Sequence, residues 1–169
     1  MDKEKDFDAQ VDEFLNNSNW IEEEYSSLAL EDAKHAWDWA YSNRNERIDV
    51  QYILKIHSLL MKNINPEIAG VIRNCDVYIG GNKKIFVSES LIKTDLFQLV
   101  CKKMDKKERS KKEEFAQKTH VAFENCHPFV DGNGRSGRIL YNIHRIKLGL
   151  PLHIIHQGDE QKAYYGWFK

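Results

Sequence analysis

The spacing of apolar residues along the chain predicts a mostly helical protein. Apolar positions recur every three or four residues, which is the period of a helix with one buried face. This pattern occupies residues 7–15, 26–40, 49–60, 88–100, 115–126, 139–150 and 161–168. The polar run at 16–19 is expected to end the first helix, and Asp49 is placed to cap the third.

Residues 76–87 have a different pattern, which predicts a β-hairpin. Two β-rich runs, Val77-Tyr78-Ile79 and Ile85-Phe86-Val87, flank the turn Gly80-Gly81-Asn82. An isolated two-stranded hairpin is marginally stable in water, so it should lie on the helical body. Its outer edge would remain free to pair with another chain.

The expected fold class is therefore all-α, a helical bundle with one small hairpin. Residues 1–45 are expected to supply N-terminal helices and residues 46–169 the core, in one compact domain. The net charge of −1 gives no sign of nucleic-acid binding, and no apolar run is long enough to span a membrane. The three cysteines have no metal-ligand spacing, and the N-terminus lacks a signal-peptide pattern. These features favour a cytoplasmic protein with reduced thiols.

The candidate chemistry is concentrated at residues 127–138, which read HPFVDGNGRSGR. Gly132 and Gly134 permit positive φ angles, so that successive backbone N–H groups can converge on an anion. Arg135 and Arg138 share a face in the first turn of the following helix, where positive charge opposes the macrodipole. An anion such as a polyphosphate explains this placement. The alternatives are a plain turn for the glycines and a buried carboxylate partner for either arginine.

Three further residues of this segment have predicted roles. His127 can act as a general base, although a lone histidine is more often structural. Asp131 suits Mg²⁺ held together with phosphate oxygens, or it caps the helix that follows. Phe129 should point inward and anchor the loop. The combination indicates nucleotidyl or phosphoryl transfer, without the Gly-Lys-Ser/Thr sequence of a Walker loop.

At these residues the chain resembles the Fic (filamentation induced by cAMP) domain family. The family signature is His-x-Phe-x-Asp/Glu-Gly-Asn-Gly-Arg-x-x-Arg, and residues 127–138 match it without a departure. The resemblance covers the chain from about Trp20 to the C-terminus. Outside the signature it rests on four short segments, 70–73, 77–80, 120–124 and 150–151, and on the pair Tyr164-Tyr165.

The resemblance implies a Mg²⁺-dependent enzyme, with Mn²⁺ as the alternative metal, that transfers AMP from ATP to a Tyr, Thr or Ser hydroxyl of a protein. Auto-AMPylation is included. His127 would be the base and Asp131 the metal ligand. The implied nucleotide-binding residues are Gly132, Asn133, Gly134, Arg135, Arg138, Tyr164 and Tyr165. The implied flap residues, which would align a target protein by strand addition, are Val77, Tyr78, Ile79 and Gly80.

Many family members carry an inhibitory helix with the pattern Ser/Thr-x-x-x-Glu-Gly/Asn. Residues 27–32 are similar, with Asp32 at the last position. The resemblance implies that Ser27 and Glu31 belong to this helix and that Glu31 pairs with Arg138. The alternative is that Glu31 is an exposed helix residue. Proteins of this subclass often self-associate, so a homo-oligomer is a further expectation.

Two other functions stay open from the sequence. One is an enzyme that uses another nucleotide donor or removes AMP, with Glu31 positioning water. The other is a non-catalytic regulatory or toxin–antitoxin-like module that binds a nucleotide. The presence of His127 speaks against the second.

Overall fold

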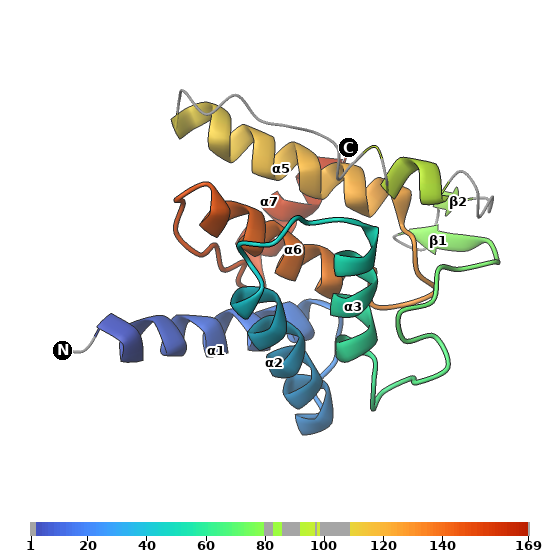
Figure 1. Cartoon of the computed structure of the whole chain (residues 1–169), viewed down its shortest axis with the longest axis horizontal. Coiled ribbons are helices and arrows are strands. Elements are labelled where there is room, and N and C mark those ends of the chain that lie inside the picture. Colours follow the sequence, from blue (N-terminus) through green and yellow to red (C-terminus); the bar gives the residue numbers. More distant parts are fainter. Residues whose placement is uncertain (1–2, 80–82, 86–91, 97, 99–108, 169) are drawn as a thin grey trace.

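The computed structural model describes residues 3–79, 83–85, 92–96, 98 and 109–168. Its helices are α1 (Lys3–Ile21), α2 (Ser27–Ser42), α3 (Val50–Leu60), α5 (Arg109–Cys126), α6 (Asn133–Lys147) and α7 (Asp159–Tyr165), with a 3-10 turn at Gly166–Phe168. The strands β1 (Val77–Ile79) and β2 (Lys83–Ile85) form an antiparallel hairpin. The predicted fold class, a helical body with one small hairpin, is confirmed (Figure 1).

Helix α6 is the central element of the fold. It packs against α1, α2, α3 and α5, and eleven of its fifteen residues are buried. Figure 1 shows α5 on one side of α6 and the first three helices on the other. A helix that is buried on nearly all sides must satisfy its polar groups internally. Arg138 and Arg145 of α6 have such contacts.

One apolar core joins α1, α2, α3, α5 and α6. It includes Phe14, Trp37, Ile53, Phe123 and Ile143, each at most 2% exposed. A smaller cluster of Ile21, Ile155 and Tyr164 seats α7 against the end of α1. Among the described residues, no helix combines the length and the apolar composition that crossing a membrane requires.

Helix α1 is longer than the sequence pattern predicts. The prediction that residues 16–19 end the first helix is wrong, because α1 continues to Ile21. Asn16 and Asn17 each donate a side-chain hydrogen bond to the carbonyl four residues earlier, at 2.8 and 2.9 Å. Ser18 and Asn19 are buried. These polar residues are therefore compatible with the helix, since their side chains bond to the preceding turn or lie in the interior.

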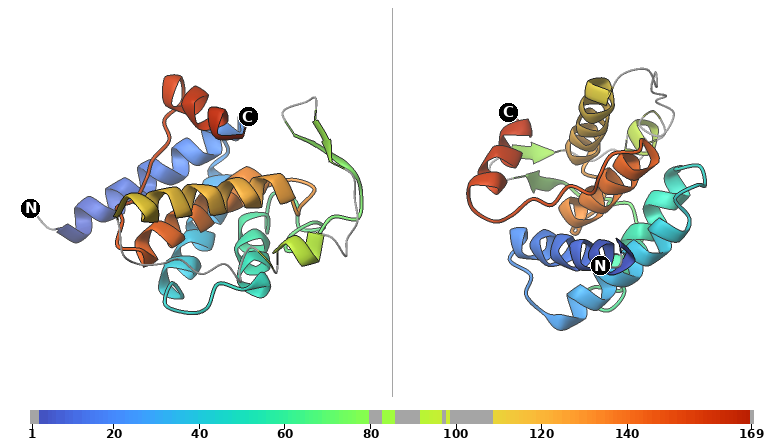
Figure 2. Two further views of the ribbon diagram at one scale, coloured as in Figure 1. Left: turned by 90° about the horizontal axis from the view of Figure 1, so that it is seen from above. Right: turned by 90° about the vertical axis from the view of Figure 1, so that its left-hand side faces the viewer.

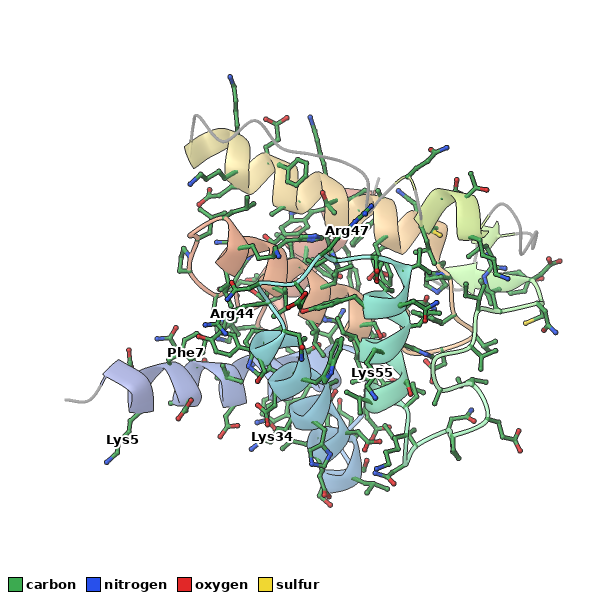
Figure 3. The ribbon with its side chains drawn as sticks, viewed as in Figure 1. Lys5, Phe7, Lys34, Arg44, Arg47 and Lys55 are labelled. Carbon is green, nitrogen blue, oxygen red and sulfur yellow. The ribbon has the colours of Figure 1, made fainter. Side chains whose placement is uncertain are left out.

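Side-chain contacts hold α1 along α2. Lys34 of α2 forms an ion pair with Asp12 of α1 at 2.8 Å, and the rings of Phe7 and Tyr41 lie 5.3 Å apart. Figure 3 labels Phe7 on α1 and Lys34 on α2. Ser26 caps α2 by accepting a hydrogen bond from the N–H of Ala29. This packing fixes the direction of α1 as its C-terminal end approaches α6.

The hairpin lies at the end of the molecule opposite the N-terminus (Figure 2). Val77 is buried and Tyr78 is 61% exposed, so β1 alternates between the body and solvent as a half-buried strand does. The predicted turn at 80–82 and the predicted strand residues Phe86 and Val87 lie outside the described residues. Of the helix predicted at 88–100, residues 92–96 and 98 are described and helical.

Candidate active site

The segment between α5 and α6 forms a rigid loop around Phe129. The Phe129 side chain is fully buried, as predicted. The amide of Asn133 brackets the backbone of Phe129, accepting from its N–H at 2.9 Å and donating to its carbonyl at 2.8 Å. Asn133 is the first residue of α6, so this pair of bonds fixes the loop against the start of the helix.

His127 directly follows α5 and is held as a neutral base. Its Nδ1 lies 3.2 Å from the carbonyl oxygen of Glu124. A carbonyl can only accept, so Nδ1 carries the proton and Nε2 is left with a lone pair. Burial lowers the pKa of His127, and the nearby charge of Arg73 acts in the same direction. A neutral ring near pH 7 is the form that a general base requires.

Arg73 holds the backbone of His127 and was not predicted from the sequence as a site residue. Its Nε donates to the His127 carbonyl at 2.7 Å, and its Nη1 donates to the Cys75 carbonyl at 2.8 Å. Its own N–H donates to the Pro128 carbonyl. His127 has a φ of +46°, a conformation that is strained for a residue with a Cβ. Arg73 therefore stabilises a strained backbone and joins it to the segment that leads into β1.

The start of α6 offers backbone N–H groups to an anion. Gly132 precedes α6 with a φ of +73° and no side-chain cap, so the first amides of the helix have no intrahelical acceptor. The Asp131 side chain is 62% exposed, and its Oδ1 accepts from the Gly132 N–H at 2.6 Å. Its carboxylate therefore stays outside the helix, at the edge of the pocket.

Arg135 is buried with part of its guanidinium unpartnered. The side chain is 4% exposed, and among the described residues its Nε and Nη1 have no hydrogen-bond partner. The Nη2 lies 3.6 Å from both Asp131 Oδ2 and Met61 Sδ, which are weak contacts. Arg135 lines a pocket of about 180 Å³ together with His127, Asp131 and Gly134. A buried cation with free N–H groups beside a helix N-terminus is suited to a phosphate.

Arg138 has its hydrogen-bonding groups occupied. Its Nη2 donates to Glu22 Oε1 and to the Ser18 carbonyl, both at 2.8 Å, and its Nε donates to Ser18 Oγ at 2.9 Å. The Arg138 side chain is 2% exposed and the Glu22 side chain 39% exposed. Burial is the largest single influence and raises the pKa of Glu22, but the charge and the hydrogen bond of Arg138, together with the charge of Arg135, leave the pKa lowered. Glu22 is therefore a carboxylate in this pair.

The predicted pairing of Glu31 with Arg138 is wrong, and Glu22 takes that place. Glu31 lies on the exposed face of α2. Ser27 is the exposed first residue of α2, next to the cap. Asp32 is fully buried and accepts from the backbone and side-chain N–H groups of Asn63, which ties α2 to the turn after α3.

A spacing in the sequence makes Glu22 a candidate, but it does not single Glu22 out. The spacing Ser-x-x-x-Glu occurs four times, at 18–22, 27–31, 42–46 and 110–114, and the first two belong to the N-terminal helices considered for inhibition. In the inhibitory pattern a Gly or Asn follows the glutamate, and these residues tolerate a left-handed backbone. Glu23 has a φ of +57°, whereas Asp32 lies inside α2. The left-handed backbone of the residue after the glutamate therefore distinguishes the segment at 18–22 from the one at 27–31.

Two aromatic residues are not in the pocket that contains His127. Tyr164 is buried, its hydroxyl lies 2.9 Å from His120 Nε2, and Arg138 lies over its ring at 5.9 Å. Its ring packs among α5, α6 and the 3-10 turn, and its contact with adenine stays a prediction. Tyr165 is 46% exposed and also lies outside the pocket lining.

Among the described side chains of the hairpin, Tyr78 contributes to the pocket. Tyr78 lines it, while the neighbouring Val77 is buried against the body. Ile79 pairs with Lys83 in the hairpin register. Gly80, the fourth predicted flap residue, lies outside the described residues. Strand β1 thus lies beside the loop between α5 and α6, residues 127–132, which we call the catalytic loop. Residues 77 and 127 are nevertheless distant in sequence.

The residues at the pocket fit a metal only if phosphate oxygens complete its shell. In the described part of the chain, no group of three or more His, Cys, Asp or Glu side chains is arranged to hold a metal ion. The Asp131 side chain is exposed beside the first amides of α6, with its Oδ1 on the Gly132 N–H and its Oδ2 3.6 Å from Arg135. One carboxylate together with substrate phosphates and water is a common Mg²⁺ arrangement.

These features define a helical protein in which a left-handed glycine turn, two buried arginines and a histidine with a free Nε2 lie together at the start of α6. Comparison with known proteins identifies the class: the chain belongs to the Fic/DOC family, whose model matches residues 47–144. The chain is 30% identical over 146 residues to a protein adenylyltransferase Fic of Aedes aegypti, covering 85% of this chain and 29% of that protein. It is 35% identical over 95 residues to a Fido domain-containing protein of Dictyostelium discoideum, covering 55% of this chain and 65% of that protein. The chain thus spans less than a third of the Aedes relative.

Solved structures share the fold. Fic-1 from C. elegans superposes with a TM-score of 0.71 at 21% identity, over 96% of this chain and 56% of that one. A Fic domain-containing signalling protein from Bacteroides thetaiotaomicron superposes with a TM-score of 0.74 at 19% identity, over 95% and 71%. Both likenesses extend over nearly the whole of the present chain, including α1.

Proposed function

We propose that this chain transfers AMP from ATP to a protein hydroxyl and that Glu22 inhibits the transfer. One observation carries the proposal. Arg135 is a buried cation with two N–H groups that have no partner among the described residues, and it lines the same pocket as His127, whose Nε2 is free. The named activity of the Aedes aegypti and Culex quinquefasciatus relatives, protein adenylyltransferase, supports the same reaction.

The reaction uses His127 as the base. The target hydroxyl oxygen forms a bond to the α-phosphorus of ATP, the bond from that phosphorus to the bridging oxygen of pyrophosphate breaks, and the hydroxyl proton moves to His127 Nε2. The amides of Asn133 and Gly134 and the guanidinium of Arg135 hold phosphate oxygens and stabilise developing charge. Mg²⁺, with Asp131 as its protein ligand, would neutralise phosphate charge and orient the leaving group.

Inhibition by Glu22 follows from the geometry of Arg138. A γ-phosphate would need the guanidinium of Arg138, which Glu22 and Ser18 now occupy. A Cβ on Gly134 would collide with Glu22 Oε1, so the missing side chain at 134 is what allows the carboxylate to reach Arg138. ATP and Glu22 therefore compete for one cation. The strand edge of the hairpin near Tyr78 is the proposed docking surface for the target segment.

A second candidate activity is removal of AMP from a modified protein. Glu22 lines the same pocket as His127 and is partly exposed, so its carboxylate could orient a water molecule. This activity would need Glu22, whereas AMP transfer would be faster without it. Measuring both reactions with the parent and Glu22→Ala separates the two candidates.

The decisive experiment follows labelled ATP into protein. The chain is incubated with Mg²⁺ and ATP that carries label at the α or the γ position, with itself and with lysate proteins as acceptors. Label from the α position alone supports AMP transfer, and transfer from γ would overturn it. His127→Ala should abolish transfer while ATP binding, measured by calorimetry, is retained. If Glu22→Ala neither transfers nor removes AMP, the chain is a nucleotide-binding module.

A further inference from the structure

His57 of α3 bridges two backbone groups that belong to different segments. Its Nε2 lies 2.9 Å from the carbonyl oxygen of Asp131, and its Nδ1 lies 2.9 Å from the backbone nitrogen of Gly70. The carbonyl can only accept and the Gly70 N–H can only donate. The ring is therefore neutral, with its proton on Nε2.

The same ring packs directly against two residues of the catalytic loop, Phe129 and Gly132. It stacks on Phe129 with centroids 3.6 Å apart and planes inclined by 5°. A Cβ added to Gly132 would lie 3.2 Å from His57 Nε2 and 2.8 Å from Met61 Sδ. The left-handed turn at Gly132 is thus pressed against His57, and there is room there only for glycine.

The position of the His57 side chain is itself fixed by the surrounding core. The side chain is fully buried in α3, in the same core as Ile53 and Leu60. Its two partners, an acceptor at Nε2 and a donor at Nδ1, are both backbone groups, so the geometry alone fixes the neutral tautomer.

We propose that His57 is a positioning residue for the catalytic loop, acting through the Asp131 carbonyl. The hydrogen bond from Nε2 sets the peptide plane between Asp131 and Gly132. That plane determines where the Asp131 carboxylate points and where the first amides of α6 lie. Through Gly70, the same ring ties the loop to the segment that leads to β1. This proposal rests on the AMP transfer proposed above.

The alternative is that His57 only fills the core, and two substitutions distinguish the roles. In His57→Gln the amide can reach the position of Nε2 and donate to the Asp131 carbonyl. In His57→Asn the shorter amide reaches only the position of Nδ1, near Gly70. Both variants remove the aromatic ring and its stacking on Phe129. Both should lower the melting temperature to a similar extent if packing is all that His57 contributes.

The kinetic test measures kcat and KM for ATP in these variants. Loop misplacement of about 1 Å can cost roughly 100-fold in rate, so His57→Asn should lose about 10- to 100-fold in kcat. His57→Gln should recover most of that loss at a similar melting temperature. Tyr52→Phe is the control, since it removes a buried hydrogen bond from the same helix, from the Tyr52 hydroxyl to the Ala40 carbonyl at 2.6 Å. It should lower the melting temperature without changing kcat.

A second measurement does not depend on catalysis. In protein with labelled histidine nitrogens, NMR should report a neutral His57 with the proton on Nε2. The amide signals of Gly132 and Gly134 should move in His57→Asn and stay near their parent positions in His57→Gln. A proton on Nδ1, or equal shifts in both variants, would overturn the positioning role. If the NMR result holds and Glu22→Ala shows no AMP transfer, the proposed function fails while the positioning role stands.

Discussion

The carboxylate of Glu22, one residue beyond the end of α1, lies 2.8 Å from the buried guanidinium of Arg138 in α6. The two residues are 116 positions apart in the chain. The last turn of α1 adds Ser18, which accepts from the same guanidinium through both its hydroxyl and its carbonyl. A phosphate group that needs Arg138 must first displace these contacts.

Replacing Glu22 by alanine should increase AMP transfer. The substitution removes the competing anion, and coupling between two sites of this kind is typically worth about 5- to 150-fold. Initial rates with α-labelled ATP and Mg²⁺ check the prediction. Glu31→Ala is the matched control, because Glu31 is exposed on α2 and should leave the rate unchanged. An increase with Glu31→Ala and none with Glu22→Ala would contradict the assignment of Glu22.

The catalytic segment was predictable from sequence because its chemistry is local. Glycines, arginines, a histidine and an aspartate lie within twelve residues, and the helix that follows fixes their relative positions. The helices and hairpin were predictable for a similar reason, since their periodicity is a local property. The start of α2 at Ser26 and of α3 at Asp49 depends on caps that are visible in the sequence.

The missed contacts join segments that are distant in sequence. Spacing alone could not choose between Glu22 and Glu31, because the choice depends on where α1 ends and how it meets α6. Arg73 and His57 act on backbone carbonyls, which carry no sequence signature at the receiving position. Tyr164 is buried among α5 and α6, which a pattern at the C-terminus does not reveal.

Arg73→Lys should reduce AMP transfer by about 10- to 100-fold while ATP binding changes little. One ammonium group cannot replace the fork that bonds both the His127 and Cys75 carbonyls, so the strained backbone at His127 should relax. Steady-state rates and calorimetric ATP affinity check the prediction. A variant with normal rates would show that His127 keeps its position without Arg73.

Glu124 should make the protein less stable as the pH rises. Its Oε1 is buried and has no hydrogen-bond partner among the described residues. Burial raises the pKa of Glu124 to about 8, from an ordinary value of 4.5. The folded state therefore binds this proton more tightly than the unfolded state, and the free energy of unfolding falls between pH 4.5 and 8.

Glu124→Gln should remove that dependence, because the amide has nearly the same shape and no charge. At pH 8 the variant should be more stable than the parent, by on the order of 1–3 kcal/mol. At pH 4.5 the two should be nearly equal. Urea unfolding of both proteins across this pH range isolates the contribution of Glu124 to the free energy of unfolding, since the histidines contribute equally to the pH dependence of each protein. A constant difference at all pH values would mean that the carboxyl titrates normally.

Glu23 is expected to destabilise the end of α1, and its replacement by glycine should stabilise the protein. Its φ of +57° is a left-handed conformation that costs a residue with a Cβ roughly 1–2 kcal/mol relative to glycine. Glycine loses part of this gain through the flexibility of the unfolded chain, which leaves a net stabilisation of about 0.5–1 kcal/mol.

The matched control is the same substitution at Glu31, which is exposed inside α2. There the backbone is right-handed, and glycine should destabilise the helix by about 1 kcal/mol. Opposite signs for Glu23→Gly and Glu31→Gly, measured by urea unfolding, would show that the chain leaves α1 through a left-handed residue directly after Glu22. Two losses of equal size would place residue 23 in an ordinary conformation. The pattern Ser-x-x-x-Glu at 18–22 would then lack the backbone turn that distinguishes it from the one at 27–31.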